Sequence, residues 1–129
     1  MTIRTIGWID ARHRPLINLR VPNRQDPVPA LIDTGFNGEL LTHGSGADVF
    51  SWQLTGVYEE VQAVGGAPLT AMALATIIWN GRVRDVTVHI VLNQNQRRRG
   101  DPVAVIGTLL LNDSKLTIDF VQQIVIIEH

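Results

Sequence analysis

The segment Pro29-Ala30-Leu31-Ile32-Asp33-Thr34-Gly35 runs a short apolar stretch directly into an acidic residue and a glycine-containing turn. A brief apolar run bounded by turn formers is typical of a buried strand. A carboxylate at the end of such a strand is held where water is scarce, and a second carboxylate beside it would share its proton. One member of such a pair can accept a proton from water while the other donates one. Asp-Thr-Gly is also common turn chemistry, because Asp caps turns and Gly adopts positive φ, so a purely structural role stays open.

The composition is that of a globular protein. Of the 129 residues 45% are hydrophobic and 18% charged, which suits a core and a single domain over residues 1–129. The formal charge of −1 predicts no general attraction to nucleic acid or to an anionic membrane. The absence of cysteine excludes disulfides, thiol catalysis and cysteine-based metal sites. Arg4 precedes any signal-like apolar region, and no apolar stretch approaches ~20 residues, so we expect a cytoplasmic protein.

Patterning along the chain indicates strands nearly everywhere, because apolar residues recur at roughly period two between turn formers. The expected strands cover residues 3–9, 16–21, 30–32, 39–42, 58–64, 69–79, 83–92, 103–106, 116–120 and 124–128. Asn80-Gly81 is the strongest hairpin signal. Short helices are expected over residues 47–54, closed by Gly56, and over residues 108–113, whereas residues 93–101 read as a loop. The pattern predicts a mostly β domain, closed or sandwiched.

A second apolar segment, Asp101-Pro102-Val103-Ala104-Val105-Ile106-Gly107, also runs into glycine and is followed by Leu109-Leu110-Leu111. Together the two segments resemble the retropepsin-like aspartic peptidases, which include the retroviral proteases and small bacterial relatives. In that family one apolar segment leads into Asp-Thr/Ser-Gly, and the other leads into a lone Gly and then a helix. Asp33-Thr34-Gly35-Phe36-Asn37-Gly38 looks particularly like the small bacterial members. The resemblance implies a closed retropepsin-type acid-protease β-barrel of one lobe, with one or two short helices.

The resemblance also implies roles for individual residues. Asp33 matches the catalytic aspartate, Thr34 the residue whose hydroxyl bonds across a two-fold axis, and Gly35 the position whose backbone meets the substrate. Gly65-Gly66 occupies the place of the mobile flap hairpin, where glycine supplies hinge freedom. The positions that match substrate contacts are Leu31, Phe36, Gly65, Gly66, Val103 and Val105. For the aliphatic residues among them, a plain core position is the alternative.

Two positions depart from the retroviral pattern. The retroviral members carry a second Asp two residues after the motif glycine, paired with an Arg directly after the lone glycine. This chain has Asn37 and Thr108 there. Both partners of the ion pair are missing together, which avoids a buried unpaired charge. We expect a neutral polar contact in its place.

A dyad requires two aspartates, and the chain supplies one motif. None of the remaining aspartates stands in an Asp-Thr/Ser-Gly context; they are Asp10, Asp26, Asp48, Asp85, Asp101, Asp113 and Asp119. The expected solution is a homodimer with Asp33 from each subunit at the two-fold axis. If the apolar strand over residues 124–127 were an exposed edge of a sheet, it would promote aggregation. In the family the chain ends build the dimer sheet, so we expect the active-site loops and termini to form the interface. A core strand within one subunit is the other reading of residues 124–127.

The remaining chemistry-bearing residues form no recognisable motif. The histidines His13, His43, His89 and His129 are scattered without metal-ligand spacing, and structural or solvent-facing roles are expected for them. We expect no metal and no cofactor. Arg97-Arg98-Arg99 reads as a solvated loop, with an acidic partner as the alternative.

Three readings of the chain remain. The first is an endopeptidase that cleaves a polypeptide with activated water. The second is a non-catalytic module with the same fold that binds peptides or dimerises. The third is an unrelated β-barrel in which Asp-Thr-Gly is an accidental turn, and this reading predicts a monomer with Asp33 facing solvent. The first is favoured because an inactive copy has no need of the acid.

Overall fold

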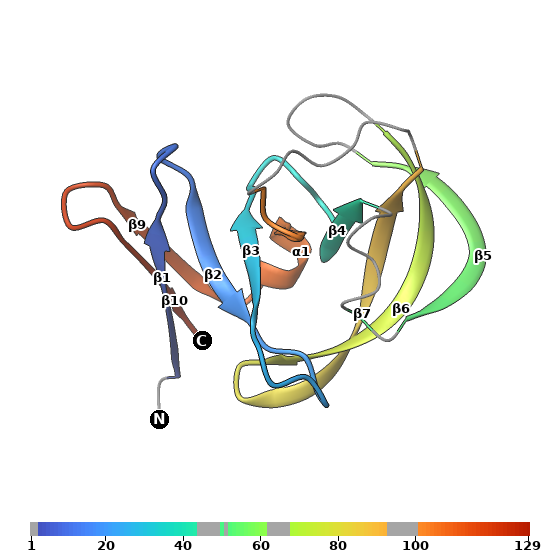
Figure 1. Cartoon of the computed structure of the whole chain (residues 1–129), viewed down its shortest axis with the longest axis horizontal. Helices are drawn as coiled ribbons and strands as arrows, with labels where there is room; N and C mark the ends of the chain where they lie inside the picture. Colours follow the sequence, from blue (N-terminus) through green and yellow to red (C-terminus); the bar gives the residue numbers. More distant parts are fainter. Residues whose placement is uncertain (1–2, 44–49, 51, 62–67, 93–100) are drawn as a thin grey trace.

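A computed structural model describes residues 3–43, 50, 52–61, 68–92 and 101–129. Ten strands and one short helix are defined there, and the strands form one sheet in the order β5-β6-β7-β4-β8-β3-β2-β1-β10-β9. Figure 1 shows β3, α1 and β4 in the middle of the molecule, between β9, β1 and β10 on one side and β5, β6 and β7 on the other. The elements are β1 (Arg4–Ile9), β2 (Pro15–Leu19), β3 (Val28–Ile32), β4 (Leu40–His43), β5 (Gln53–Glu60), β6 (Leu69–Trp79), β7 (Arg82–Val91), β8 (Ala104–Ile106), α1 (Thr108–Leu111), β9 (Lys115–Asp119) and β10 (Ile124–Glu128).

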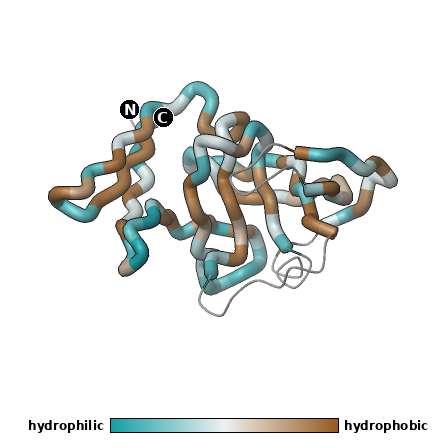
Figure 2. Tube along the Cα trace, turned by 90° about the horizontal axis from the view of Figure 1, so that it is seen from above, coloured by the Kyte–Doolittle hydropathy of each residue, from teal (hydrophilic) through white to brown (hydrophobic). Residues whose placement is uncertain are grey.

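The mostly β character predicted from the sequence is confirmed. The longest hairpin joins β6 to β7 through Asn80-Gly81, whose φ angles of 55° and 71° are the positive values that a tight two-residue hairpin turn requires. Figure 2 shows mainly hydrophobic strands connected by hydrophilic turns, with the two termini side by side. That placement agrees with the antiparallel pairing of Arg4 with Glu128.

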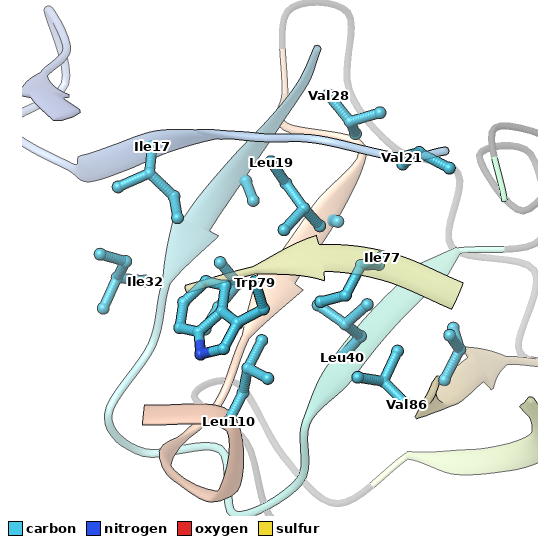
Figure 3. Close-up of a cluster of buried hydrophobic side chains, with 14 of the residues drawn as sticks. Ile17, Leu19, Val21, Val28, Ile32, Leu40, Ile77, Trp79, Val86 and Leu110 are labelled. Atoms are coloured by element: carbon cyan, nitrogen blue, oxygen red, sulfur yellow. The ribbon is translucent and has the colours of Figure 1, made fainter. Parts of the chain in front are cut away.

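One face of the curved sheet encloses the main hydrophobic core. Alternate residues of β3, β4, β6, β7 and β8 point into it, as period two dictates. Figure 3 shows Trp79 from β6 beside Leu110 from α1 and Ile32 from β3. Leu110 has 0% of its surface exposed, so the single helical turn closes one end of this core. A smaller cluster of Phe36, Leu41, Val61 and Val91 occupies the opposite face, with Val105 packed against it.

The closed barrel implied by the sequence is not confirmed. The sheet has two ends, β5 and β9, and no ladder joins them among the described residues. The sheet does curl so far that Arg20, just after β2, forms a single bridge with Ile78 of β6. The amide of Ile78 donates to the carbonyl of Arg20 at 2.9 Å. One bridge brings β2 and β6 together without pairing them along their lengths.

The prediction of a helix over residues 47–54 is wrong at its C-terminal end. Residues 44–49 and 51 lie outside the described residues, but Gln53 and Leu54 belong to β5 and pair with Leu74 and Ala73 of β6. Gly56 lies inside this strand with φ of 82°, where the register shifts between Leu54 and Tyr58. Pairing with a long neighbouring strand overrides the local helical pattern. The second expected helix is present as α1, shortened to residues 108–111.

The C-terminal strand is an interior strand of the sheet. β10 lies between β1 and β9, and its Val125 and Ile127 are 0% exposed. The second interpretation of residues 124–127, a core strand within one subunit, therefore describes β10, because both of its edges are paired in the sheet. The use of the chain ends in a dimer stays a prediction. The edge of this end of the sheet is β9. Two apolar side chains in the turn after β9 are exposed to solvent: Phe120 is 56% exposed and Val121 is 93% exposed.

Ile77→Ala should lower the free energy of unfolding by about 2–5 kcal/mol, because Ile77 is 0% exposed and its loss leaves a cavity. Val83→Ala on the neighbouring strand is the matched control, since Val83 is 69% exposed and should cost about 0.5 kcal/mol or less. Urea unfolding of both variants measures the difference. Equal losses for the two variants would contradict the assigned core.

Candidate active site

Parallel pairing of β3 with β8 brings the two apolar segments together. Leu31 is aligned with Val105 and Ile32 with Ile106, so both strands end at the same place. Directly beyond them the amide of Asp33 donates to the carbonyl of Ile106 at 2.9 Å. The acid of the first segment is therefore fixed against the end of the second.

The loop that carries Asp33 is a compact turn. The amide of Gly35 donates to Oδ1 of Asp33 at 2.8 Å, and the amide of Phe36 donates to the Asp33 carbonyl at 3.1 Å. Asp33 is partly buried, whereas Thr34 and Gly35 are exposed. Within the described part of the chain, the Thr34 hydroxyl makes no hydrogen bond. The turn thus holds one carboxylate oxygen by its own backbone and presents its tip to the outside.

Phe36 anchors the far side of this loop. Its side chain is 0% exposed and meets the ring of His89 edge-on, with ring centroids 5.8 Å apart. A side chain at Gly107 would come within 2.3 Å of the Gly38 carbonyl oxygen and 2.6 Å of that of Phe36, so only glycine allows this approach. The expected substrate contact of Phe36 can come only from its backbone in this conformation.

Hydrogen bonds link the loop to α1. The amide of Thr108 donates to the Phe36 carbonyl at 2.8 Å, and its hydroxyl reaches the same oxygen at 3.3 Å. The amide of Leu109 donates to the Gly38 carbonyl at 3.2 Å. The expected neutral contact of Thr108 exists, but its partner is the Phe36 backbone. Asn37 is exposed.

An apolar pocket of about 140 Å³ opens beside the end of β3. It brings together three of the predicted substrate-contacting residues, Leu31, Val103 and Val105, each of which is partly buried. Leu41 and Pro102 complete its apolar wall. The other predicted contacts, Gly65 and Gly66, lie outside the described residues.

A charged network borders the apolar pocket. Arg14 donates to Oδ2 of Asp10 at 2.9 Å and to Oδ1 of Asp101 at 3.2 Å, and Arg12 also reaches Asp101 at 3.2 Å. Burial would raise the pKa of Asp10, but hydrogen bonds from Arg14 and from the Arg12 amide outweigh it and lower the pKa. Burial likewise opposes the charge of Arg14, and its bonds to Asp10 and Asp101 raise its pKa. Arg14 is therefore a fixed cation at the pocket's border.

A second pocket, of about 340 Å³, opens beyond the other end of the Asp33 loop. We call it the acidic pocket, because Glu39, Glu59 and Glu60 line it together with Asn37 and Gly38 of the loop. Its remaining lining residues include Val61, Met72, Thr87, His89 and Leu109. Two oxygens of Glu39 are already engaged, one by Arg84 at 2.9 Å and one by the Thr87 amide at 3.0 Å. No Lys or Arg among the described residues lines this pocket.

His89 is the buried titratable group of the acidic pocket. It is 6% exposed, and its Nδ1 lies 3.2 Å from the hydroxyl of Thr70. Burial lowers the pKa of His89, against the opposing attraction of Glu59 and Glu39. The imidazole is consequently neutral at neutral pH.

The sequence pattern did not single out Arg14, His89 or the three glutamates. Each lies on a strand or at a strand end, and only the sheet register brings them beside the loop. A usable signal was present in β7, where His89 interrupts an otherwise aliphatic run over residues 88–91. A polar residue in a buried run requires a partner, which here is Thr70.

Two further features bear on possible chemistry. No group of three or more His, Cys, Asp or Glu side chains within the described residues could hold a metal ion. No helix in the described part of the chain is long and apolar enough to cross a membrane.

Comparison with known proteins identifies the class of fold. No family model matches the chain, and no curated protein matches it. Among solved structures, a retropepsin-like aspartic protease from Rickettsia conorii matches with a TM-score of 0.66 at 17% sequence identity. The match covers 100% of this chain and 92% of that one. The chain therefore has a retropepsin-like fold, and the activity in that name belongs to the Rickettsia protein.

Acid should destabilise the fold through His89. The unfolded chain, with an ordinary histidine pKa of 6.5, binds more protons than the folded chain below that pH. The free energy of unfolding should therefore fall as the pH is lowered from about 7.5 to about 5.5. Urea unfolding across this range measures the slope.

His89→Gln, which cannot titrate, should reduce that slope. A residual slope is expected from His129, whose pKa burial also lowers. His13→Asn removes an exposed imidazole and is the control that should leave the slope in place. An unchanged slope in His89→Gln would refute the assignment of the neutral form to His89.

Proposed function

We propose that this chain is one subunit of a homodimeric aspartic endopeptidase, in which the Asp33 carboxylates of two subunits form the catalytic dyad. The observation that carries the proposal is the placement of Asp33 against the end of β8 in a retropepsin-like fold. The third reading, an unrelated barrel, predicts neither the fold nor this pairing. Thr34 and Gly35 belong to the same exposed turn and are proposed as its catalytic neighbours.

The proposed chemistry is hydrolysis by activated water. With one proton shared by the two carboxyls, one Asp33 accepts a proton from water as that water attacks the peptide carbonyl carbon. The other Asp33 donates its proton to the carbonyl oxygen, which gives a tetrahedral gem-diol. The peptide C–N bond then breaks as a hydroxyl of the gem-diol returns its proton to one Asp33 and the other Asp33 protonates the leaving nitrogen. The hydrogen bond from the Gly35 amide to Oδ1 of Asp33 fixes the orientation of each carboxylate without placing a cation beside it. The dyad titrates as a unit, so neither copy has a separate role before substrate binds.

The dimer is proposed to form through the exposed turn and the outer end of the sheet. The exposed Thr34 hydroxyl is available for a bond across the two-fold axis. At the chain-terminal end, β9 presents an unpaired edge, and Phe120 and Val121 add exposed apolar surface. Burying such an edge against a second copy removes an aggregation hazard. This surface takes the place of the strand over residues 124–127 that the sequence suggested. We also propose that the sheet closes into a retropepsin-type barrel and that the protein is cytoplasmic.

The substrate is proposed to be an extended polypeptide. Leu31, Val103 and Val105 would contact one of its side chains in the apolar pocket. Gly65 and Gly66 are proposed to contribute to the flap, and the backbone of Phe36 to the substrate-facing loop. An extended peptide can add to a sheet edge through main-chain hydrogen bonds while pockets select alternate side chains.

A non-catalytic peptide-binding or dimerisation module with the same fold is the alternative. Such a module would have the same pockets and the same dimer surface as the proposed peptidase, but Asp33 would have no catalytic role. Cleavage assays therefore separate the two candidates.

Asp33→Asn should lower the rate of peptide cleavage by about a thousandfold or more, because the amide can neither accept nor donate the required proton. The measurement is cleavage of a peptide library from acidic to neutral pH by wild type and variant. Asp113→Asn is the matched control: Asp113 is exposed with φ of 69°, a conformation that Asn adopts readily, and cleavage should persist.

Equal cleavage by wild type and Asp33→Asn would exclude Asp33 as the catalytic group. Absence of cleavage by folded wild type at every pH would favour the non-catalytic module. Circular dichroism of each variant ensures that a lost activity does not reflect a lost fold.

A further inference from the structure

The acidic pocket and the apolar pocket lie on the same face of the sheet. Cross-strand partners connect them in one continuous row, running Leu31–Val105–Leu41–His89–Met72. Direct partners on neighbouring strands point to the same side. The row begins at the apolar pocket and ends at the acidic pocket, which Asn37 and Gly38 of the Asp33 loop also line. A peptide that fills the apolar pocket is therefore led toward the acidic pocket.

His89 offers a hydrogen-bond acceptor to the acidic pocket. The Thr70 hydroxyl donates its only proton to the Glu59 carbonyl at 2.9 Å, so its oxygen accepts from Nδ1–H of His89. A neutral imidazole protonated at Nδ1 keeps a lone pair on Nε2. Nε2 has no partner in the described residues and is not sealed from solvent, although 94% of the His89 surface is buried. It is thus an unpartnered acceptor on a ring that lines the pocket.

The charged groups of the pocket are acceptors as well. Glu59 and Glu60 come from the edge strand β5, and their carboxylates make no bond with the described residues. Glu39 adds a third carboxylate, which Arg84 partly neutralises. The side walls formed by Val61, Met72 and Leu109 are apolar. Apolar walls with acceptors and negative charge at the polar positions complement a long aliphatic stem that ends in a cationic donor.

We propose that the acidic pocket is a subsite for a lysine or arginine side chain of the peptide substrate. This inference rests on the proposed peptidase function and adds a substrate class to it. The ammonium or guanidinium donates to Nε2 of His89 and to Glu59, and the stem packs against Met72 and Leu109. A metal ion is a poorer occupant, because the described residues include no group of three ligands that could hold one.

The test separates binding from cleavage. Short peptides carrying Lys, Arg, Gln, norleucine or Glu at each position in turn are titrated into the full-length Asp33→Asn protein, with fluorescence anisotropy as the readout. The same peptides are then offered to wild type for cleavage. At one position, Lys and Arg peptides should bind at least about threefold more tightly than the norleucine peptide, and this advantage should shrink as salt is added.

Substitutions in the pocket identify the groups responsible. In the Asp33→Asn background, Glu59→Gln should reduce the advantage of Lys over norleucine, because Glu59 is aligned with Thr70 on the face that carries His89. Glu60 follows it on β5, and strand alternation points its side chain to the other face, so Glu60→Gln should keep most of the advantage. These residues are exposed on an edge strand, so the variants should fold. Asp26→Asn removes an equal charge from an exposed loop outside the pocket and is the matched control, which should keep the advantage.

Each outcome has a distinct meaning. Equal binding of Lys and norleucine peptides at every position overturns the subsite, even if wild type cleaves them all. A Lys advantage that survives undiminished in Glu59→Gln also overturns it. A Lys advantage that depends on Glu59, in a protein that cleaves nothing, supports the subsite and counts against the peptidase.

Discussion

The parallel pairing of β3 with β8 is the constraint on which the rest of this structure depends. It aligns Leu31 with Val105 and ends both strands together, so that the Asp33 amide reaches the Ile106 carbonyl at 2.9 Å. Parallel strands cannot be joined by a tight turn, and the chain between them supplies four of the ten strands, β4 to β7. The close approach at Gly107, where a Cβ would come within 2.3 Å of the Gly38 carbonyl oxygen, then fixes the loop against α1.

The two faces of β3 and β8 have different surroundings: one packs into the main core and the other lines the apolar pocket. Ala30, Ile32, Ala104 and Ile106 point into the main core and are at most 5% exposed. Their neighbours Leu31 and Val105 point to the other face, where they line the apolar pocket. Period-two alternation thus allows one short strand to hold the fold with one set of side chains and to shape a pocket with the other. Phe36 packs on this second face with Leu41, Val61 and Val91, and it is 0% exposed.

Local pattern predicted what depends on local chemistry. Alternating apolar residues located β6 to its observed bounds, and Asn80-Gly81 predicted its hairpin, because turn type follows from two residues. Register was beyond this reasoning: the alignment of Leu41 with His89 and of His89 with Met72 creates the acidic pocket, and single-strand pattern does not encode which strands pair. The same limit explains the error at Gln53 and Leu54, whose strand conformation comes from pairing with β6. The position of β10 inside the sheet likewise depends on its pairing with β1, which the pattern of neither strand encodes.

The central claim is that Asp33 acts only when a second copy faces it, and subunit mixing tests this most directly. Wild-type and Asp33→Asn subunits are combined in equal amounts, allowed to exchange, and assayed at constant total protein. If two Asp33 residues share one site, only dimers with two wild-type subunits are active, and activity falls to about one quarter of that of pure wild type. Activity of about one half would show that each subunit works alone and would contradict the shared dyad.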